Sequence, residues 1–364
     1  GLDPWIDPIR PDPSDIFLEY QANEVIQAGN LFLGPAAASL KVHAQDLVII
    51  NGLMMSEFDN GHEAAMNYMS TGNGQGRAAD LPAEIGLTTQ LGEYGVLASD
   101  QLMLANRVVP YMQVQDILSA RSAQDPGEFL DGARVHLPSP IERAAQDIVR
   151  NQALTKRLMA QLKIFSDAGI DLSSESEMGA VVAACFLSGA VRQAKTDFWF
   201  GNLDSHSNHE KLHLAGQTSA WEQVAHIFKF FKSLPYGNRG ASLFDHTLFM
   251  VISDFARTPS LNGARGKDHN PMTNSVLLAG AGLKKNTVIN KSLLIEAQRS
   301  KIGASYHMAS PFDFATGQPA TSRQGADFIY PENLALTVAM AMGADLSQFQ
   351  SVPTGTKVIP GILV

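Results

Sequence analysis

Aspartate and histidine recur together at three points of this chain, each next to a short apolar stretch. The first point holds Asp204 and His206, the second Asp254, and the third Asp268 and His269. Carboxylate oxygens and imidazole nitrogens are ligands that zinc, manganese and iron take in proteins. The sequence therefore predicts a divalent-metal site, with Zn or Mn as the expected ion. These five side chains could hold one ion fully or two sparsely.

Two further residues stand close to this pattern. His62 follows the apolar stretch 47–50 through a loop that ends Asp59-Asn-Gly-His62. Arg257 comes three residues after Asp254, where its guanidinium could neutralise an anion at the same site or form an ordinary salt bridge with Asp254. Structural roles are open for each residue alone, because Asp after a strand is a common turn or capping residue and a lone His is often hydrogen-bonded in a core. Only the joint pattern favours a metal site.

Short apolar segments alternate with helical patterns and would position these side chains. Strands are expected at 47–50, 108–114, 197–203, 246–253 and 275–279, and helices at 35–44, 61–70, 140–168, 174–194, 219–234 and 331–342. The helix at 219–234 is expected to open with a capping box formed by Ser219 and Glu222. Apolar strands separated by helices indicate an α/β fold with a mostly parallel central sheet sandwiched by helices. Ligands bind such sheets beyond the carboxyl ends of the strands, where we expect the candidate residues to meet.

The composition is that of an acidic globular protein. The chain has 364 residues, a formal net charge of −9, 45% hydrophobic residues and 17% charged residues. This acidity argues against nucleic acid or an anionic membrane as the main partner. The longest apolar run, 178–191, is shorter than the about 20 residues of a membrane span and predicts a buried helix. The single cysteine, Cys185, excludes an intramolecular disulfide and a cysteine-based zinc site.

Several segments resemble the DUF1501 family. DFWFGNLDSHSNH, FDHTLFMVISDFART, GKDHN and VLLAGAGLK are similar to its C-terminal half, and LFLGPAAASL, DLVIINGL and GHEAAMNYMSTG to its N-terminal part. The family's WDTH-like, S-[ED]-F-G-R-T and G-x-D-H segments correspond here to residues 203–206, 253–258 and 266–269. The resemblance covers about 30–75, 195–285 and 331–345. It leaves 115–175 unmatched, so we expect a single domain, 1–364, with a helical insertion there.

The resemblance implies both a fold and a chemistry. DUF1501 proteins are uncharacterised, usually Tat-exported bacterial proteins of the alkaline phosphatase/sulfatase superfamily. A periplasmic or otherwise exported, alkaline phosphatase-like hydrolase of phosphate or sulfate esters is therefore implied, with a small anionic ester as substrate. Aligning Thr71-Gly72 with the end of the sulfatase motif places His62 at the nucleophile position, where a neutral imidazole could equally be a metal ligand. Arg257 would help to hold the anionic group.

The chain also departs from the superfamily pattern. The Cys, Pro, Ser and Arg of the sulfatase motif are absent around His62, and the superfamily's paired Asp-His is Asp254-Phe255 here. The superfamily's first strand, with its bridging Asp, is expected just upstream of residue 1 unless Asp3 takes that role. These departures support an alternative function, in which a non-catalytic exported binding or assembly protein keeps the fold.

Overall fold

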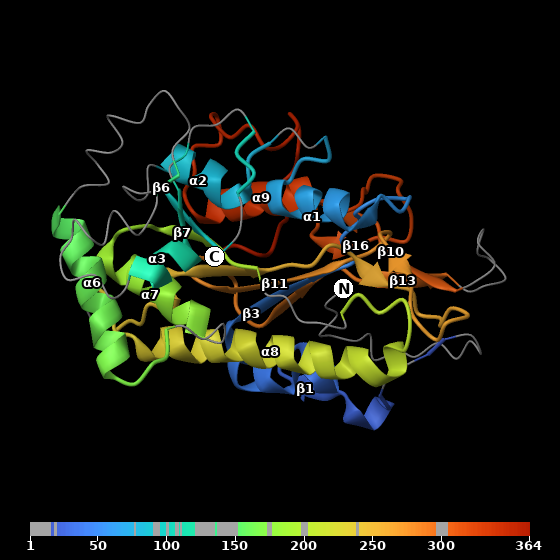
Figure 1. The fold of residues 1–364 in the computed structure, drawn as a ribbon. Coiled ribbons are helices and arrows are strands. Elements are labelled where there is room, and N and C mark those ends of the chain that lie inside the picture. The colour runs from blue at the N-terminus through green and yellow to red at the C-terminus, as the bar shows by residue number, and fades with distance from the viewer. Residues whose placement is uncertain are drawn as a thin grey trace.

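A four-stranded sheet forms the centre of the molecule. The computed structural model describes residues 16–17, 20–75, 78–89, 95–99, 102–105, 109, 111–120, 135–136, 152–172, 177–197, 203–237, 240–295 and 305–364. The strand order in the central sheet is β12 (Thr287–Ile289), β3 (Leu47–Asn51), β11 (Ser275–Gly280) and β8 (Leu248–Val251). Figure 1 shows this sheet between α8 on one side and α1 with α9 on the other.

Side chains of β3 and β11 alternate between the two faces of the sheet, and both faces are apolar. One face belongs to the core formed with α8 (His209–Ser233) and the 3-10 helix η2 (Pro35–Asp46), and it carries Leu47, Ile49, Leu277 and Ala279. The other face packs on α1 (Gly61–Thr71) and α9 (Pro331–Ala341), and it carries Val48, Ile50, Val276 and Leu278. Burial on both faces explains why these strands read as continuous apolar runs. The expected mixed α/β architecture with helices on both faces is confirmed.

The central sheet is mixed in direction, and the prediction of a mostly parallel sheet was wrong for it. β12 runs parallel to β3, but β11 runs antiparallel to both β3 and β8. Parallel neighbours need a crossover connection, usually through a helix. The segment between β8 and β11 contains only the short strands β9 (Ala256–Arg257) and β10 (His269–Asn270). The alternation of helices and strands along the chain predicted parallel pairing, but no helix separates β8 from β11 or β11 from β12.

The reversed strand determines what lies at the edge of the sheet. Ser275, the first residue of β11, pairs with Asn51 at the end of β3, and Leu277 pairs with Val251 at the end of β8. The segment before β11 therefore lies at the same edge as the loops that follow β3 and β8. A parallel β11 would have placed that segment at the opposite edge.

A second four-stranded sheet has the order β6, β5, β4 and β7. β4 (Val96–Ala98) is parallel to β5 (Tyr111–Gln113) and to β7 (Gln193–Lys195), while β6 (Val135–His136) is antiparallel to β5. The helices in this part of the chain are α2 (Leu81–Thr89), α3 (Val114–Ala120), α6 (Gln152–Asp167) and α7 (Met178–Ser188). Of the predicted strands 108–114 and 197–203, residues 108, 110 and 198–202 lie outside the described residues.

The ends of α1 and α8 show which of the sequence motifs for helix ends predicted the structure correctly. α1 ends at Gly72, whose φ of 69° is the left-handed conformation that glycine favours in that position. On α8 the predicted apolar stripe is buried and includes Trp221 and Phe228. However, α8 begins at His209, so the capping box predicted at Ser219 lies inside the helix. Such motifs are short and recur by chance, and here the helix begins earlier, at His209, whose amide donates to the Arg265 carbonyl.

The expected helical insertion at 115–175 falls largely on residues outside the described ranges. Its described helix α6 contributes Leu154, Leu158 and Leu162 to the same core as α7. No described helix is both long and apolar enough to cross a bilayer. The remaining short elements are η1 (Ala22–Glu24), β1 (Ile26–Ala28), β2 (Leu31–Leu33), η4 (Phe244–His246), β13 (Ser292–Ile295), β14 (Tyr306–Ala309), β15 (Phe312–Asp313) and β16 (Gln318–Pro319).

Candidate metal centre

Three segments that are far apart in the sequence meet at the edge of the central sheet. The loop after β3 brings His62 at the start of α1. The loop before α8 brings Asp204 and His206. The ribbon formed by β9 and β10 brings Arg257 and His269, which are paired directly across its two strands. The antiparallel direction of β11 is what places this ribbon beside the other two segments.

Backbone and side-chain hydrogen bonds fix the loop before α8 against the loop before β10. The Lys267 amide donates to the Ser205 carbonyl at 2.9 Å, and the Asn262 side-chain amide donates to the His206 carbonyl at 3.1 Å. Gly266 lies directly against the His206 backbone, with no room for a side chain. The two loops therefore form one unit, and the positions of Asp204 and His206 depend on both.

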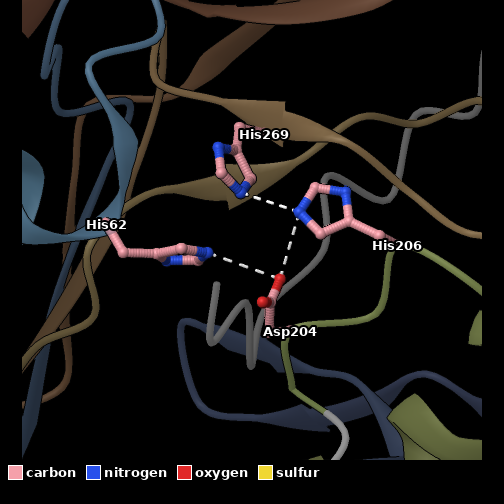
Figure 2. A group of neighbouring side chains, drawn as sticks. All are labelled: His62, Asp204, His206 and His269. Atoms are coloured by element: carbon pink, nitrogen blue, oxygen red, sulfur yellow. Dashed lines mark hydrogen bonds and ion pairs between the residues drawn. The ribbon is translucent and has the colours of Figure 1, made fainter.

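Four side-chain atoms converge at this edge: Nε2 of His62, His206 and His269 and an oxygen of Asp204 (Figure 2). They all lie within 4.8 Å of one another. Asp204 Oδ1 is 3.4 Å from His62 Nε2 and 3.2 Å from His206 Nε2, and the Nε2 atoms of His206 and His269 are 2.8 Å apart. No other group of three or more His, Cys, Asp or Glu in the described part of the chain meets this criterion.

The Nδ1 atom of each of the three imidazoles, on the side of the ring away from the cluster, contacts a carboxylate. His62 Nδ1 contacts Asp254 Oδ2, His206 Nδ1 is 3.1 Å from Asp268 Oδ1, and His269 Nδ1 is 2.9 Å from Asp59 Oδ2. An ionised carboxylate accepts the proton on Nδ1, so the lone pair of each ring is on Nε2, facing the other ligand atoms. Carboxylates in this position orient histidine ligands and fix their tautomer in metal sites.

Two of the predicted ligands, Asp254 and Asp268, lie outside the group of four converging side chains. Asp254 and Asp268 were predicted as metal ligands, but in the structure they contact the Nδ1 atoms of histidines. His62, predicted as a nucleophile or a ligand, points its Nε2 at Asp204. That Nε2 is buried and has no hydrogen-bond partner among the described residues. A buried nitrogen lone pair without a donor is a group that a cation would satisfy.

The electrostatics of the cluster favour the charged forms of Asp204 and Asp268 and the neutral form of His269. Burial lowers the pKa of His269, an effect that outweighs the opposing attraction of Asp59. For Asp204, partial burial acts to raise the pKa, but the hydrogen bond and the charge of Arg257 bring it below its usual value. The same balance holds for Asp268, whose pKa is lowered by Asn262 and His206 against the effect of burial. Ionised carboxylates and neutral imidazoles are the forms that bind metals.

Arg257 is the most buried charged side chain of the cluster, at 5% exposure. Its Nη2 donates to Asp204 Oδ1 at 2.5 Å, and its Nη1 donates to the Lys267 carbonyl at 3.2 Å. The alternative partner considered from the sequence was Asp254. The ribbon instead presents the guanidinium to Asp204, in the adjoining loop.

Sequence reasoning named Asp59 in the loop before His62 but did not count it as a site residue. In the structure both carboxylate oxygens of Asp59 lie within 3.0 Å of His269 Nδ1. Partial burial acts to raise the pKa of Asp59, but the Gly61 amide and His269 lower it below its usual value. The signal available was an Asp three residues before a His, which alone is also a common turn sequence.

Replacing Asp59 with Asn is expected to weaken metal binding by about 10- to 100-fold, the usual effect of removing a carboxylate behind a histidine ligand. The amide no longer fixes the Nδ1 proton of His269, so the ring loses its preferred tautomer. Zinc affinity measured by competition with a chelator tests this. Asp167→Asn is a matched control, because Asp167 is exposed and pairs with Lys163 on α6. An unchanged affinity in Asp59→Asn would contradict the role given to Asp59.

The buried His209 supports the loop that carries Asp204 and His206. His209 Nδ1 is 2.5 Å from the hydroxyl of Ser205, the residue between Asp204 and His206. Its ring stacks on His213 at 4.2 Å between centroids. Burial, followed by the charges of His213 and Lys267, lowers the pKa of His209 to about 2. His209 is therefore a neutral structural residue at any pH at which the protein would work.

The buried His209 predicts a loss of stability in acid. Its pKa is near 6.5 in the unfolded chain and about 2 when folded, so the unfolded state takes up a proton as the pH falls below 6.5. This costs the folded state about 2 kcal/mol between pH 7 and pH 5. Urea unfolding in EDTA at both pH values should show His209→Gln losing about 2 kcal/mol less over this interval than the wild type. His226→Gln, at an exposed site, should keep the wild-type pH dependence. An equal dependence in both variants would contradict this.

Comparison with known proteins locates the family resemblance on part of the chain. Residues 173–295 match a family described as "Protein of unknown function (DUF1501)". The match supports the resemblance noted from the sequence, and the matched residues include Asp204, His206, Arg257 and His269. Searches of curated proteins and of solved structures gave no significant match.

Proposed function

We propose that this protein is a metal-dependent hydrolase of phosphate or sulfate esters, with one divalent ion held by His62, Asp204, His206 and His269. The observation that carries the proposal is the convergence of three imidazole Nε2 atoms and a carboxylate oxygen, each imidazole held by a second carboxylate. The DUF1501 match over residues 173–295 supports it, because three of these four residues, Asp204, His206 and His269, lie within the matched range.

The donor set fits a cation of the size of Zn²⁺ or Mn²⁺. With Nδ1 protonated, the lone pairs of His206 Nε2 and His269 Nε2 face each other at 2.8 Å, which is repulsive unless a positive charge lies between them. Ligands at about 2.0–2.1 Å around a tetrahedral zinc are about 3.3 Å apart. The separations of 2.8, 3.2 and 3.4 Å within the cluster are close to that value.

The protein would contribute orientation and charge to the reaction. A bound divalent ion would supply Lewis-acid polarisation of the ester and activation of a water molecule. The side chains of His62, Asp204 and His206 are 42–50% exposed, so a substrate can approach them from solvent. Arg257 lies beside the same atoms and provides a planar cation suited to a phosphate or sulfate group. A His62 that binds the metal cannot also be the nucleophile, which leaves attack to water.

The alkaline phosphatase-like superfamily and export from the cytoplasm belong to this proposal as well. Their support is the motif resemblance and the presence of an Asp- and His-rich edge on a sheet sandwiched by helices. Fold resemblance alone does not establish activity. The proposal therefore depends on the metal site.

A second candidate is a non-catalytic binding or assembly protein that keeps a metal for structure. The observation that favours it is the number of protein ligands, because four protein ligands complete a tetrahedral zinc, as in structural zinc sites. Catalytic zinc sites usually keep one position open for water or substrate. Mn²⁺, which accepts six ligands, would retain open positions with the same four side chains.

Elemental analysis and turnover of the purified protein distinguish these candidates. We expect about one Zn or Mn per chain, lost after treatment with a chelator. We also expect metal-dependent hydrolysis of p-nitrophenyl phosphate or p-nitrophenyl sulfate. One metal per chain without turnover of either ester would favour the binding protein. No bound metal after incubation with Zn²⁺ or Mn²⁺ would overturn both candidates.

A further inference from the structure

The guanidinium of Arg257 contacts two of the four candidate ligand atoms, where a metal cation would otherwise bind. Its Nη2 is 2.5 Å from Asp204 Oδ1, and its Nη1 is 3.3 Å from His206 Nε2. In Figure 2 these are the carboxylate oxygen and the ring nitrogen that face each other across the cluster. The protein thus carries its own positive charge at the point where a metal would bind.

His206 Nε2 cannot serve Arg257 and a metal ion together, because a neutral imidazole has a single lone pair. A guanidinium left within a few ångströms of a divalent ion would also be repelled by it. Metal binding therefore requires Arg257 to give up its contact with His206, and the repulsion by the ion also favours its withdrawal from Asp204.

Once Arg257 has left these partners, its buried guanidinium N–H groups need new hydrogen-bond acceptors. The guanidinium keeps the Lys267 carbonyl at 3.2 Å as an anchor. Its Nε is already buried and has no hydrogen-bond partner among the described residues. Buried donors without acceptors are costly, and a guanidinium that faces a cation has a strong preference for an anion between the two charges.

We infer that Arg257 exchanges between two partners: it pairs with Asp204 and His206 when no metal is bound, and it binds a tetrahedral oxyanion when the metal is present. The inference rests on the metal site of the proposed function and adds a regulation to it. The anion site exists only in the metal-loaded protein, so apoprotein does not hold substrate. By reciprocity, an oxyanion tightens metal binding by the same factor by which the metal tightens anion binding.

The inference is tested by the zinc affinity of wild type, Arg257→Gln and Arg265→Gln, measured by chelator competition at constant ionic strength. Each protein is titrated in chloride alone and with phenylphosphonate, a stable analogue of a phosphate ester. Arg265→Gln is the matched control, because Arg265 is an exposed cation of the same loop that pairs with Glu210. It removes one positive charge without touching the four ligand atoms.

In chloride we expect Arg257→Gln to bind zinc about tenfold more tightly than wild type, and Arg265→Gln to remain within about twofold of wild type. Phenylphosphonate should tighten zinc binding at least fivefold in wild type and in Arg265→Gln, but not in Arg257→Gln. Weaker zinc binding by Arg257→Gln, or an undiminished phenylphosphonate effect in it, would overturn the inference and leave the metal site intact. If none of the proteins binds Zn²⁺ or Mn²⁺, the proposed function fails as well.

A measurement on wild type alone covers the case in which Arg257→Gln does not fold. Calorimetric titration of phenylphosphonate into the chelated and the zinc-loaded protein should show binding only to the loaded form. Equal binding to both forms would contradict the exchange of partners by Arg257.

Discussion

Replacing His62 with Ala is expected to weaken zinc binding by about 100- to 1,000-fold. Four-ligand zinc sites bind with about 10–16 kcal/mol, so the loss of one ligand of four corresponds to about 3 kcal/mol or more. His62 Nε2 points into the ligand cluster, and its Nδ1 is held by Asp254, so the ring is fixed for this purpose. Alanine is a good helix former, and the first turn of α1 should remain intact.

The same variant separates the two roles that the sequence allowed for His62. A nucleophilic His62 predicts that His62→Ala keeps one zinc per chain at unchanged affinity and loses only turnover. A ligand predicts that affinity and turnover fall together, and that turnover is partly restored at high zinc concentration. His226→Ala is the control, since His226 is an exposed histidine that pairs with Glu177. Unchanged zinc affinity in His62→Ala would remove His62 from the ligand set.

Which residues gather at the candidate metal centre was largely predictable, but which of their atoms face its centre was not. Spacing showed that Asp204, His206 and His269 recur at the ends of strands, and the structure brings all three together. Spacing does not show which atom of an Asp or a ring faces the centre. Asp254 and Asp268 also lie at this edge of the sheet, but they contact the Nδ1 atoms of His62 and His206. That distinction depends on rotamers and on the packing of three loops, which exist only in the folded chain.

The direction of β11 within the central sheet could not be predicted from the sequence either. The apolar sequence of β11 made it easy to identify as a strand, and its six residues are all buried in the structure. An apolar run carries no information on whether its neighbours run parallel or antiparallel, and the assumption of a mostly parallel sheet was wrong here. Under that assumption, Asp268 and His269 would have been far from His62. Their expected proximity to the other candidates therefore depended on the antiparallel pairing that the sequence did not reveal.

The start of α8 shows the limit of local signals. Ser219 and Glu222 have the spacing of a capping box, but they lie within the helix, which begins at His209. Asn208, the residue before it, adopts a left-handed conformation with φ of 51°. The additional turns bring His209 under Ser205, so the N-terminus of α8 supports the loop that carries Asp204 and His206. A helix beginning at Ser219 would leave that loop without this support.

Replacing Gly266 with Ala is expected to destabilise the protein by about 3 kcal/mol and to weaken zinc binding at least about tenfold. A Cβ on Gly266 would lie 1.9 Å from the carbonyl carbon and oxygen of His206 and 2.4 Å from the Ser207 nitrogen. All three are backbone atoms, so no side chain can rotate away to make room. The loop that carries His206 must move instead, and a ligand position is lost without any change to a ligand.

Gly263 provides the matched control, because it lies in the same loop and a Cβ there has no atom within 4 Å. Gly263→Ala should keep wild-type zinc affinity and be equally or slightly more stable, since alanine lowers the entropy of the unfolded chain. Urea unfolding without metal and zinc competition assays measure the two effects separately. Loss of stability with unchanged zinc affinity in Gly266→Ala would mean that the ligands hold their geometry independently of this contact. Loss of both would show that the close packing of two loop backbones, one of them lacking a side chain, sets the geometry of the metal centre.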